Sequence, residues 1–155
     1  MNYVFIGGIP ASSKSYLAAK IAKDFNLIHI DVDKLRKEMV QDLALEPYVN
    51  FFWNKNEDEY WQKTTCDEHW LNLVKQSEAF WPTIKKKVDL ITKRGEWAIF
   101  EGVNILPHLA DKDFSFPGIF LLGESFEIIF ERNKKEPRWG QTEVLQRKEA
   151  EMFFY

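Results

Sequence analysis

The octapeptide GIPASSKS, residues 8–15, lies between a predicted strand and a predicted helix. Before it, residues 3–6 read YVFI, a run of apolar and β-favouring side chains that stops at two glycines and is typical of a buried strand. After it, apolar residues recur on one helical face: Leu17, Ala18, Ile21, Ala22 and Phe25. A strand, a glycine-led loop and a helix therefore follow one another directly.

Three further apolar runs predict strands at residues 27–30, 97–100 and 119–122. Helical patterns separate them, and the first of these has its apolar positions at Leu35, Met39, Val40 and Leu43. Because strands that alternate with helices form right-handed βαβ units, we expect an α/β fold of three layers, with a parallel sheet and helices on both faces. The chain has 155 residues and no internal repeat or linker, so we predict a single domain over residues 1–155.

A helical, aromatic-rich insertion is expected at about residues 45–94, on the substrate side of the sheet. One apolar face at helical spacing predicts a helix that packs on the sheet: Trp70, Leu73, Val74, Ser77, Trp81, Ile84, Val88 and Ile91. Pro82 should kink this helix or start a new one, and Arg94-Gly95 should end it. Most of the aromatic side chains are interpreted as core and cover. Residues 48–53 fit the spacing worst and are predicted to form the lip of a substrate site.

Residues 8–15 match the Walker A pattern except at one position. The pattern is Gly, four free positions, Gly, Lys and then Ser or Thr, and Ser13 stands where the second glycine belongs. A side chain there is expected to strain or narrow the loop. Backbone N–H groups of such a loop and the following helix N-terminus attract phosphate, whereas the alternative is a serine-rich turn that caps an ordinary helix. The predicted nucleotide-binding residues are Gly8, Ile9, Pro10, Ala11, Ser12, Ser13, Lys14, Ser15 and Tyr16.

Two side chains of the loop have individual predicted roles. Lys14 would contact the β- and γ-phosphates as a catalytic residue, and the Ser15 hydroxyl would ligate Mg²⁺. ATP and Mg²⁺ are therefore the predicted cofactors.

Three carboxylates and an arginine follow the second and third predicted strands. A carboxylate there can accept the proton of an attacking hydroxyl, and an arginine can hold an anionic acceptor. Either Asp31 or Asp33 should cap the next helix, and Asp33 is the predicted catalytic base. Glu101 would hold Mg²⁺ through a water molecule or contact the acceptor, or else be a solvated charge. The predicted substrate-binding residues are Asp31, Asp33, Arg36, Glu101 and Gly102.

A mobile lid is expected at about residues 132–142. Arg132 and Arg138 accompany the charged turn KKEPRWG at residues 134–140, where Pro and Gly indicate a connection between two helices. Both arginines are predicted catalytic residues, since they can neutralise charge that develops on a transferred phosphoryl group. The alternative is an ordinary solvated connection.

The order of GIPASSKS, DVDKLR, FEGVNILP and an arginine-bearing lid resembles the P-loop nucleoside monophosphate and small-metabolite kinases. Within them, the chain is most similar to the 2-phosphoglycerate kinase and polynucleotide-kinase-like branch, over residues 3 to about 147. The resemblance implies a sheet in the order 2-3-1-4-5 and ATP with Mg²⁺ at Lys14 and Ser15. It also implies an acceptor near Asp33, Arg36 and Glu101.

The sequence departs from this family at three places. Ser13 replaces a glycine, Asn104 replaces the histidine of an EGVH-like turn, and no segment before Tyr155 supplies the fifth strand. The apolar end MFFY, residues 152–155, suggests that the natural chain continues or that the base pocket is open.

The expected function is transfer of the γ-phosphoryl group of ATP to a small, anionic acceptor. The main alternative is a non-catalytic nucleotide-binding regulator. A kinase of nucleic-acid ends and an interaction domain built on residues 48–61 are further alternatives. The net charge of −3 argues against a nucleic-acid partner. A single cysteine, Cys66, and no signal or membrane segment predict a cytoplasmic protein; no pattern indicates the oligomeric state.

Overall fold

The computed structural model describes residues 3–49, 56–138 and 140–155. The predicted lip at 48–53 thus lies largely outside the described residues. The elements in chain order are β1 (Tyr3–Gly8), α1 (Lys14–Phe25), β2 (Ile28–Asp31), a 3₁₀ turn (Val32–Leu35), α2 (Arg36–Met39), α3 (Glu46–Val49), α4 (Glu57–Lys63), α5 (Cys66–Lys93), β3 (Ala98–Glu101), α6 (Pro107–Asp113), β4 (Gly118–Leu121), α7 (Phe126–Lys135) and α8 (Glu143–Phe154).

The strands form one parallel sheet, which confirms the predicted α/β class. Its order is β2-β3-β1-β4. The five-stranded order 2-3-1-4-5 implied by the resemblance differs from it, because no fifth strand lies beyond β4 in the described part of the chain. The register pairs Glu101 of β3 with Ile6 of β1 and with Asp31 of β2. The carboxyl ends of the strands therefore meet at one edge of the sheet, where the loop after β1 begins.

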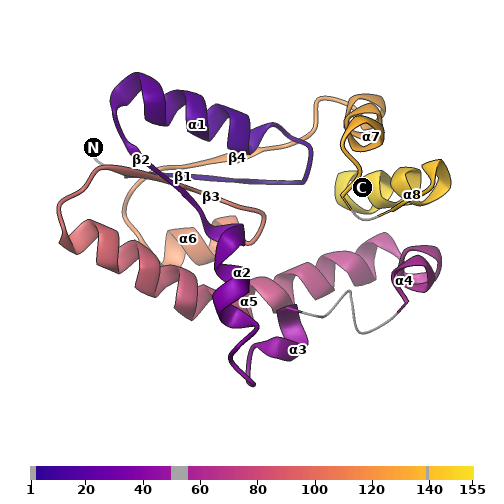
Figure 1. Ribbon diagram of the computed structural model, residues 1–155, viewed down its shortest axis with the longest axis horizontal. Helices are drawn as coiled ribbons and strands as arrows, with labels where there is room; N and C mark the ends of the chain where they lie inside the picture. The colour runs from indigo at the N-terminus through magenta and orange to yellow at the C-terminus, as the bar shows by residue number, and fades with distance from the viewer. Residues whose placement is uncertain (1–2, 50–55, 139) are drawn as a thin grey trace.

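Helices cover both faces of the sheet (Figure 1). On one face, Ala18 and Ala22 of α1 pack against Ile6 and Ile99 of the sheet. On the other face, α5 and α6 enclose the larger core, in which Phe5 and Phe100 of the sheet contact α5. Alternate residues of a strand point to opposite faces, which is why Phe5 and Ile6 belong to different clusters.

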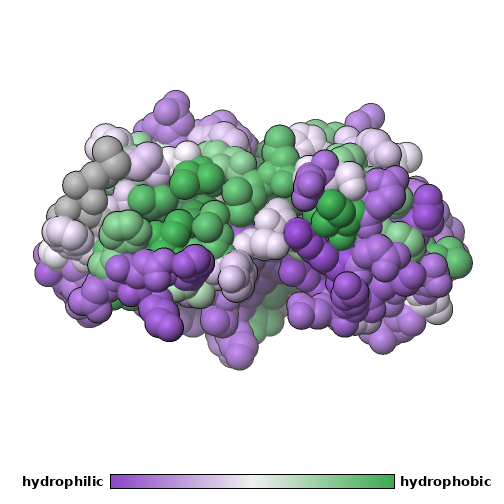
Figure 2. Space-filling view, turned by 90° about the horizontal axis from the view of Figure 1, so that it is seen from above, coloured by the Kyte–Doolittle hydropathy of each residue, from purple (hydrophilic) through white to green (hydrophobic). Residues whose placement is uncertain are grey.

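The α1 face is only partly covered. Figure 2 shows hydrophobic side chains gathered on this side of the molecule. Val4, Leu17, Ile21 and Leu121 are half-buried against the α1 cluster, and Ile119 of the edge strand β4 is exposed.

Helices α7 and α8 pack against each other beyond the end of the sheet, as Figure 1 shows. Both α4 and α5 contact α8. Tyr60 and Trp61 of α4 are buried with Leu145 and Met152 of α8, so this pair is anchored to the helical insertion rather than to the strands. In the described part of the chain, no helix is long and apolar enough to cross a membrane.

The helices differ in detail from the predictions. Of the two outcomes expected at Pro82, a kink or a new helix, the new helix does not occur, because α5 continues through this residue. Pro82 and Glu78 are both exposed, so water can satisfy the carbonyl that a proline leaves without a donor. The helix predicted at Leu35–Leu43 is a 3₁₀ turn followed by the single turn α2. Leu43 lies in the loop after α2 and is 92% exposed.

The apolar faces also extend less far than their spacing predicts. Phe25 at the end of α1 is exposed, and so is Trp70 on α5. The first turns of α5 pack on α8 instead of the sheet, with His69 buried against Phe153 and the neighbouring Trp70 exposed. The interior of α5 does pack on the sheet as predicted, through Trp81, Ile84 and Val88.

Candidate functional site

The loop after β1 has an unusual backbone. Gly8 has φ +138°, and a Cβ on it would lie 2.2 Å from the carbonyl oxygen of Leu121 and 2.9 Å from its nitrogen. The adjacent edge strand therefore requires glycine at this position. Ala11 and Ser13 also have positive φ, of 60° and 67°. For a residue with a side chain, this left-handed conformation costs roughly 1–2 kcal/mol.

Ser13 thus adopts the conformation that a glycine would adopt with less strain. Its side chain is exposed and makes no capping hydrogen bond to α1. The loop is held instead through the carbonyl oxygen of Ile9. This oxygen accepts hydrogen bonds from the Ser12 Oγ at 2.7 Å and from the Lys14 Nζ at 3.3 Å.

Lys14 lies at the centre of the charged groups. It is buried, and burial lowers the pKa of its ammonium group, as does the positive charge of Arg138, whereas the negative charges of Asp33 and Glu101 raise this pKa.

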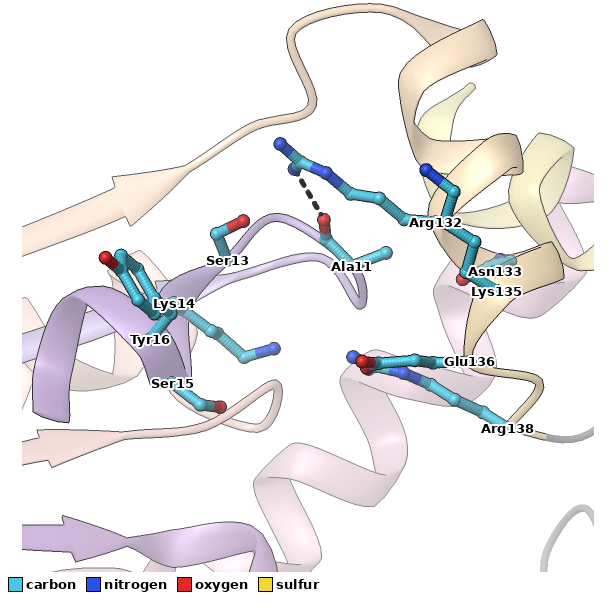
Figure 3. Close-up of a pocket in the computed structure, with 10 residues that line it drawn as sticks. All are labelled: Ala11, Ser13, Lys14, Ser15, Tyr16, Arg132, Asn133, Lys135, Glu136 and Arg138. Atoms are coloured by element: carbon cyan, nitrogen blue, oxygen red, sulfur yellow. Dashed lines mark hydrogen bonds between the residues drawn. The ribbon is translucent and has the colours of Figure 1, made fainter.

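A cavity of about 380 Å³ opens between the loop and the α7–α8 connection (Figure 3). Its lining residues are Ala11, Ser13, Lys14, Ser15, Tyr16, Arg132, Asn133, Lys135, Glu136 and Arg138. They include four basic side chains and one acidic side chain, so the cavity favours an anionic ligand.

Arg132 connects α7 to the loop. Its Nη1 donates to the carbonyl oxygen of Ala11 at 2.9 Å, the contact dashed in Figure 3. In the same view, Lys14 and Arg138 point toward a common space. The sequence-predicted residues Gly8, Ile9, Pro10 and Ser12 form the loop but do not line this cavity.

Glu101 ends β3 beside the loop and is 1% exposed, so it is not a solvated charge. Its Oε1 lies 3.3 Å from His29 Nε2, and its Oε2 is buried without a hydrogen-bond partner among the described residues. Burial raises the pKa of this carboxyl, the negative charge of Asp31 raises it further, and the Ser15 hydroxyl and Lys14 ammonium lower it.

Asp31 and Asp33 have different roles in the structure. Asp31 is the cap, because its Oδ1 accepts the Asp33 backbone N–H at 3.0 Å. Asp33 instead accepts the backbone N–H of Val103, which lies 3.2 Å from each carboxylate oxygen. Gly102 permits this approach, since a Cβ there would lie 2.8 Å from the Asp33 Oδ1 and 2.5 Å from the Val32 Cγ2.

Arg36 extends from α2 toward the turn after β3. Its Nη2 donates to the Asn104 Oδ1 at 2.8 Å, and its guanidinium carbon lies 5.9 Å from the centre of the Phe80 ring. Asn104, the residue that departs from the family's histidine, is therefore the direct partner of Arg36. Arg36 and the three carboxylates do not line the cavity of Figure 3, but the negative charges of the carboxylates act on Lys14, which does line it.

Two residues of this region were missed from the sequence. His29 is a polar residue inside the apolar run LIHI, and Gln76 is a polar residue beside Ser77 on the apolar side of α5. His29 contacts Glu101 and Gln76 contacts Arg36, in each case across a long stretch of chain. Only the polar residue type at each position could therefore have indicated a buried contact. A polar side chain in an otherwise apolar run usually has a buried partner.

A divalent cation would find few protein ligands here. No group of three His, Cys, Asp or Glu side chains suited to a metal occurs in the described residues. Mg²⁺ commonly binds through one or two protein oxygens together with phosphate oxygens and water. The Ser15 hydroxyl and the unpaired Oε2 of Glu101 are oxygen donors of this kind, so the residues present fit such an ion.

No protein-family model matches the chain, and no curated protein matches it in sequence. Among solved structures, it is similar to a gluconokinase from Sinorhizobium meliloti 1021, with a TM-score of 0.45 and 16% sequence identity. The similarity covers 98% of this chain and 74% of that chain. The two proteins are thus similar in the arrangement of their backbones, with little similarity in sequence.

Proposed function

We propose that this chain is an ATP-dependent phosphotransferase that moves the γ-phosphoryl group to a small anionic acceptor. The supporting observation is the position of the buried Lys14. Lys14 lines a cavity together with other basic side chains, and the negative charges of Asp33 and Glu101 act on its ammonium group. An anionic donor and a hydroxyl-bearing acceptor would meet at this ammonium group.

The cavity of Figure 3 is proposed to hold the triphosphate. A phosphate oxygen would offer the Lys14 Nζ a charged acceptor in place of the neutral Ile9 carbonyl, and charge-assisted hydrogen bonds are about twice as strong as neutral ones. Arg132 and Arg138 would neutralise charge that develops on the transferred group. Ser13 and Tyr16 would contact the nucleotide at the α1 side of the cavity.

Mg²⁺ would be held by the Ser15 hydroxyl and, through water, by Glu101. When bound, the ion supplies positive charge to the phosphate oxygens. The buried Glu101 carboxylate is costly without such a partner, because burial raises its pKa. His29 lies against the other oxygen of this carboxylate and would orient it.

Asp33 is proposed to accept the proton of the attacking hydroxyl, and Arg36 to hold the acceptor's anionic group. The Val103 N–H fixes the Asp33 carboxylate in place while leaving it lone pairs for a further hydrogen bond. Asp31 and Gly102 would shape the acceptor site, the first as a cap and the second by giving Asp33 room.

The alternative proposal is a nucleotide-binding regulator without transfer activity. It is favoured by Ser13, whose left-handed backbone adds strain to the loop at the position where the Walker A pattern has glycine. This alternative predicts nucleotide binding that depends on Lys14, with no acceptor.

A screen of ATP consumption tests the two proposals together. Purified chain, ATP and Mg²⁺ are mixed with hydroxy acids, phosphorylated hydroxy acids and uncharged polyols, and phosphoryl transfer is followed by ³¹P NMR. We expect transfer to an anionic member of the panel and none with Lys14→Ala. Nucleotide binding without transfer to any member would favour the regulator, and absence of binding would contradict both.

A further inference from the structure

We propose that Gln76 and Asn104 form a neutral amide cradle that positions Arg36 and reserves its positive charge for the anionic group of the acceptor. The inference rests on the proposed function and adds two positioning residues to it. The three side chains come from α5, the turn after β3, and α2, respectively.

The cradle directs two carbonyl oxygens at one guanidinium nitrogen. The Arg36 Nη2 donates to the Asn104 Oδ1 at 2.8 Å and to the Gln76 Oε1 at 3.4 Å. Both amides are buried, with Gln76 0% and Asn104 1% exposed. Side chains enclosed in this way have little freedom to turn, so the guanidinium is held in one place.

Further hydrogen bonds determine which way each amide points. The Gln76 Nε2 donates to the Tyr48 carbonyl oxygen at 2.8 Å, which leaves the Gln76 oxygen on the side of Arg36. The Asn104 Nδ2 donates to the Ser77 Oγ at 2.9 Å and to the Gln76 Oε1 at 3.1 Å. Reversal of either amide would place its N–H groups against the Arg36 cation and its oxygen against oxygens that now accept its N–H groups, so the observed orientation is strongly preferred.

The cradle orients Arg36 without neutralising it. Among the described residues, no ion pair joins Arg36 to a carboxylate, and the Arg36 Nε is buried without an acceptor. A half-buried cation with neutral partners and an unused N–H is unfavourable by itself. An oxyanion beside the guanidinium group would supply the missing negative charge.

The position of the cradle connects it to the proposed base. Val103, whose N–H binds the Asp33 carboxylate, directly precedes Asn104 in the chain. An anionic group on Arg36 therefore lies near the residue proposed to accept the hydroxyl proton. The ligand chemistry is a carboxylate or a phosphate, since both present oxygens to an arginine.

The test adds a charge inside the cradle. Gln76→Glu has nearly the same shape as the native side chain but supplies a carboxylate that pairs with Arg36 and competes with the ligand. Inorganic phosphate and acetate are titrated separately into the full chain with saturating ADP and Mg²⁺. The Arg36 side-chain Nε–H signal and the backbone amide signal of Asn104 are followed by NMR, and the amide signal reports probe binding in the variant that lacks Arg36. We expect one probe to bind the native chain, and Gln76→Glu to weaken it about tenfold or more.

Several variants make the result specific. Asn104→Asp also places a carboxylate beside Arg36 and should lower the affinity for the same probe. Arg36→Gln should abolish probe binding. Gln62→Glu adds one negative charge on the exposed surface of α4 and should leave probe affinity unchanged. Urea unfolding checks that each variant is folded. The probe that binds, phosphate or acetate, identifies the anionic group.

Two results would overturn the cradle. One is a native chain whose Arg36 signal responds to neither probe, and the other is an Arg36→Gln variant that binds a probe as tightly as the native chain. Neither result depends on whether the Gln76 and Asn104 variants fold. If ADP still binds in a Lys14-dependent manner, the proposed phosphotransferase stands although the cradle fails; loss of that dependence is the separate failure of the proposed function.

Discussion

The backbone N–H of Val103 lies 3.2 Å from each carboxylate oxygen of Asp33. This contact joins the turn after β2 to the turn after β3, and it determines where the Asp33 carboxylate lies relative to Lys14 and Glu101. Asp33 is therefore not the cap of the following turn, a role that Asp31 fills.

Asp33→Asn is expected to separate catalysis from folding. Asparagine retains an oxygen that can accept the Val103 N–H, so melting temperature and ADP affinity should stay close to the native values. It cannot act as a base at neutral pH, so the phosphoryl-transfer rate should fall about 10²–10⁴-fold. Rapid-quench measurement of ATP turnover with the acceptor found in the screen checks the rate.

Asp31→Asn is the matched control for this substitution. Asparagine caps about as well as aspartate, so stability and turnover should both be retained. If Asp33→Asn transfers phosphate at the native rate while Asp31→Asn does not, the two roles have been exchanged.

Lys14→Ala should weaken ADP and ATP binding strongly. The substitution removes the positive charge that would contact the β- and γ-phosphates. Isothermal titration calorimetry measures the affinity, and Lys20→Ala, which removes an exposed lysine of α1 paired with Asp24, serves as the control. Equal affinity in the native chain and Lys14→Ala would remove the phosphate-loop interpretation.

Ser13→Gly should raise the free energy of unfolding by about 1 kcal/mol, because glycine adopts a positive φ with less strain. The φ of 67° at Ser13 and the exposure of its side chain motivate this expectation. ADP affinity should be retained or improved. A clear drop in affinity would mean that the Ser13 hydroxyl itself contacts the nucleotide.

Ser12→Gly provides the contrast within the same loop. Ser12 has a side-chain hydrogen bond to the Ile9 carbonyl oxygen at 2.7 Å and no positive φ. Loss of that bond should lower the free energy of unfolding by about 1 kcal/mol. Urea denaturation of both variants tests whether the two serines have effects of opposite sign.

The α7–α8 connection should exchange amide hydrogens more slowly when a triphosphate is bound. Arg132 contacts the Ala11 carbonyl, and Arg138 acts on Lys14, so a polyphosphate between them would tie the connection to the loop. Hydrogen exchange over residues 132–142, with and without an ATP analogue and Mg²⁺, measures this change. Identical exchange in both states would make the two arginines ordinary surface charges.

His69 should make the fold less stable at acidic pH. Burial lowers the pKa of its imidazole to about 4, from an ordinary value of 6.5. The unfolded chain therefore takes up the proton first as the pH falls, and stability is lost between these two values. One pKa unit corresponds to about 1.4 kcal/mol, so the total loss from this group is on the order of 3 kcal/mol.

Urea unfolding of the native chain and of His69→Asn across this pH range checks the prediction. The variant is expected to be less stable at pH 8, because the replaced ring contacts Tyr60 and Phe153. Its stability should nevertheless fall less steeply with decreasing pH than that of the native chain. Parallel pH profiles would show that His69 does not titrate in this way.

Local sequence patterns were sufficient for the loop and for the strands. Residues 8–15 carry their glycine, lysine and serine at spacings that follow from the loop itself, and each predicted strand lies within a residue or two of an observed one. These features depend on neighbouring residues in the chain. The strain at Ser13 was also predictable, because a side chain replaces a glycine at a position of positive φ.

Tertiary structure decided the environment of each charged side chain. Glu101 is buried because β1 and β2 flank β3 on both sides, and its own sequence neighbourhood does not reveal this. Arg36 meets Gln76 and Asn104 across 40 and 68 residues of chain, so no local pattern connects them. Spacing shows which side of a helix is apolar, but the packing of other elements determines how much of that side is covered. Trp70 and Phe25 belong to apolar faces by their spacing and are nevertheless exposed.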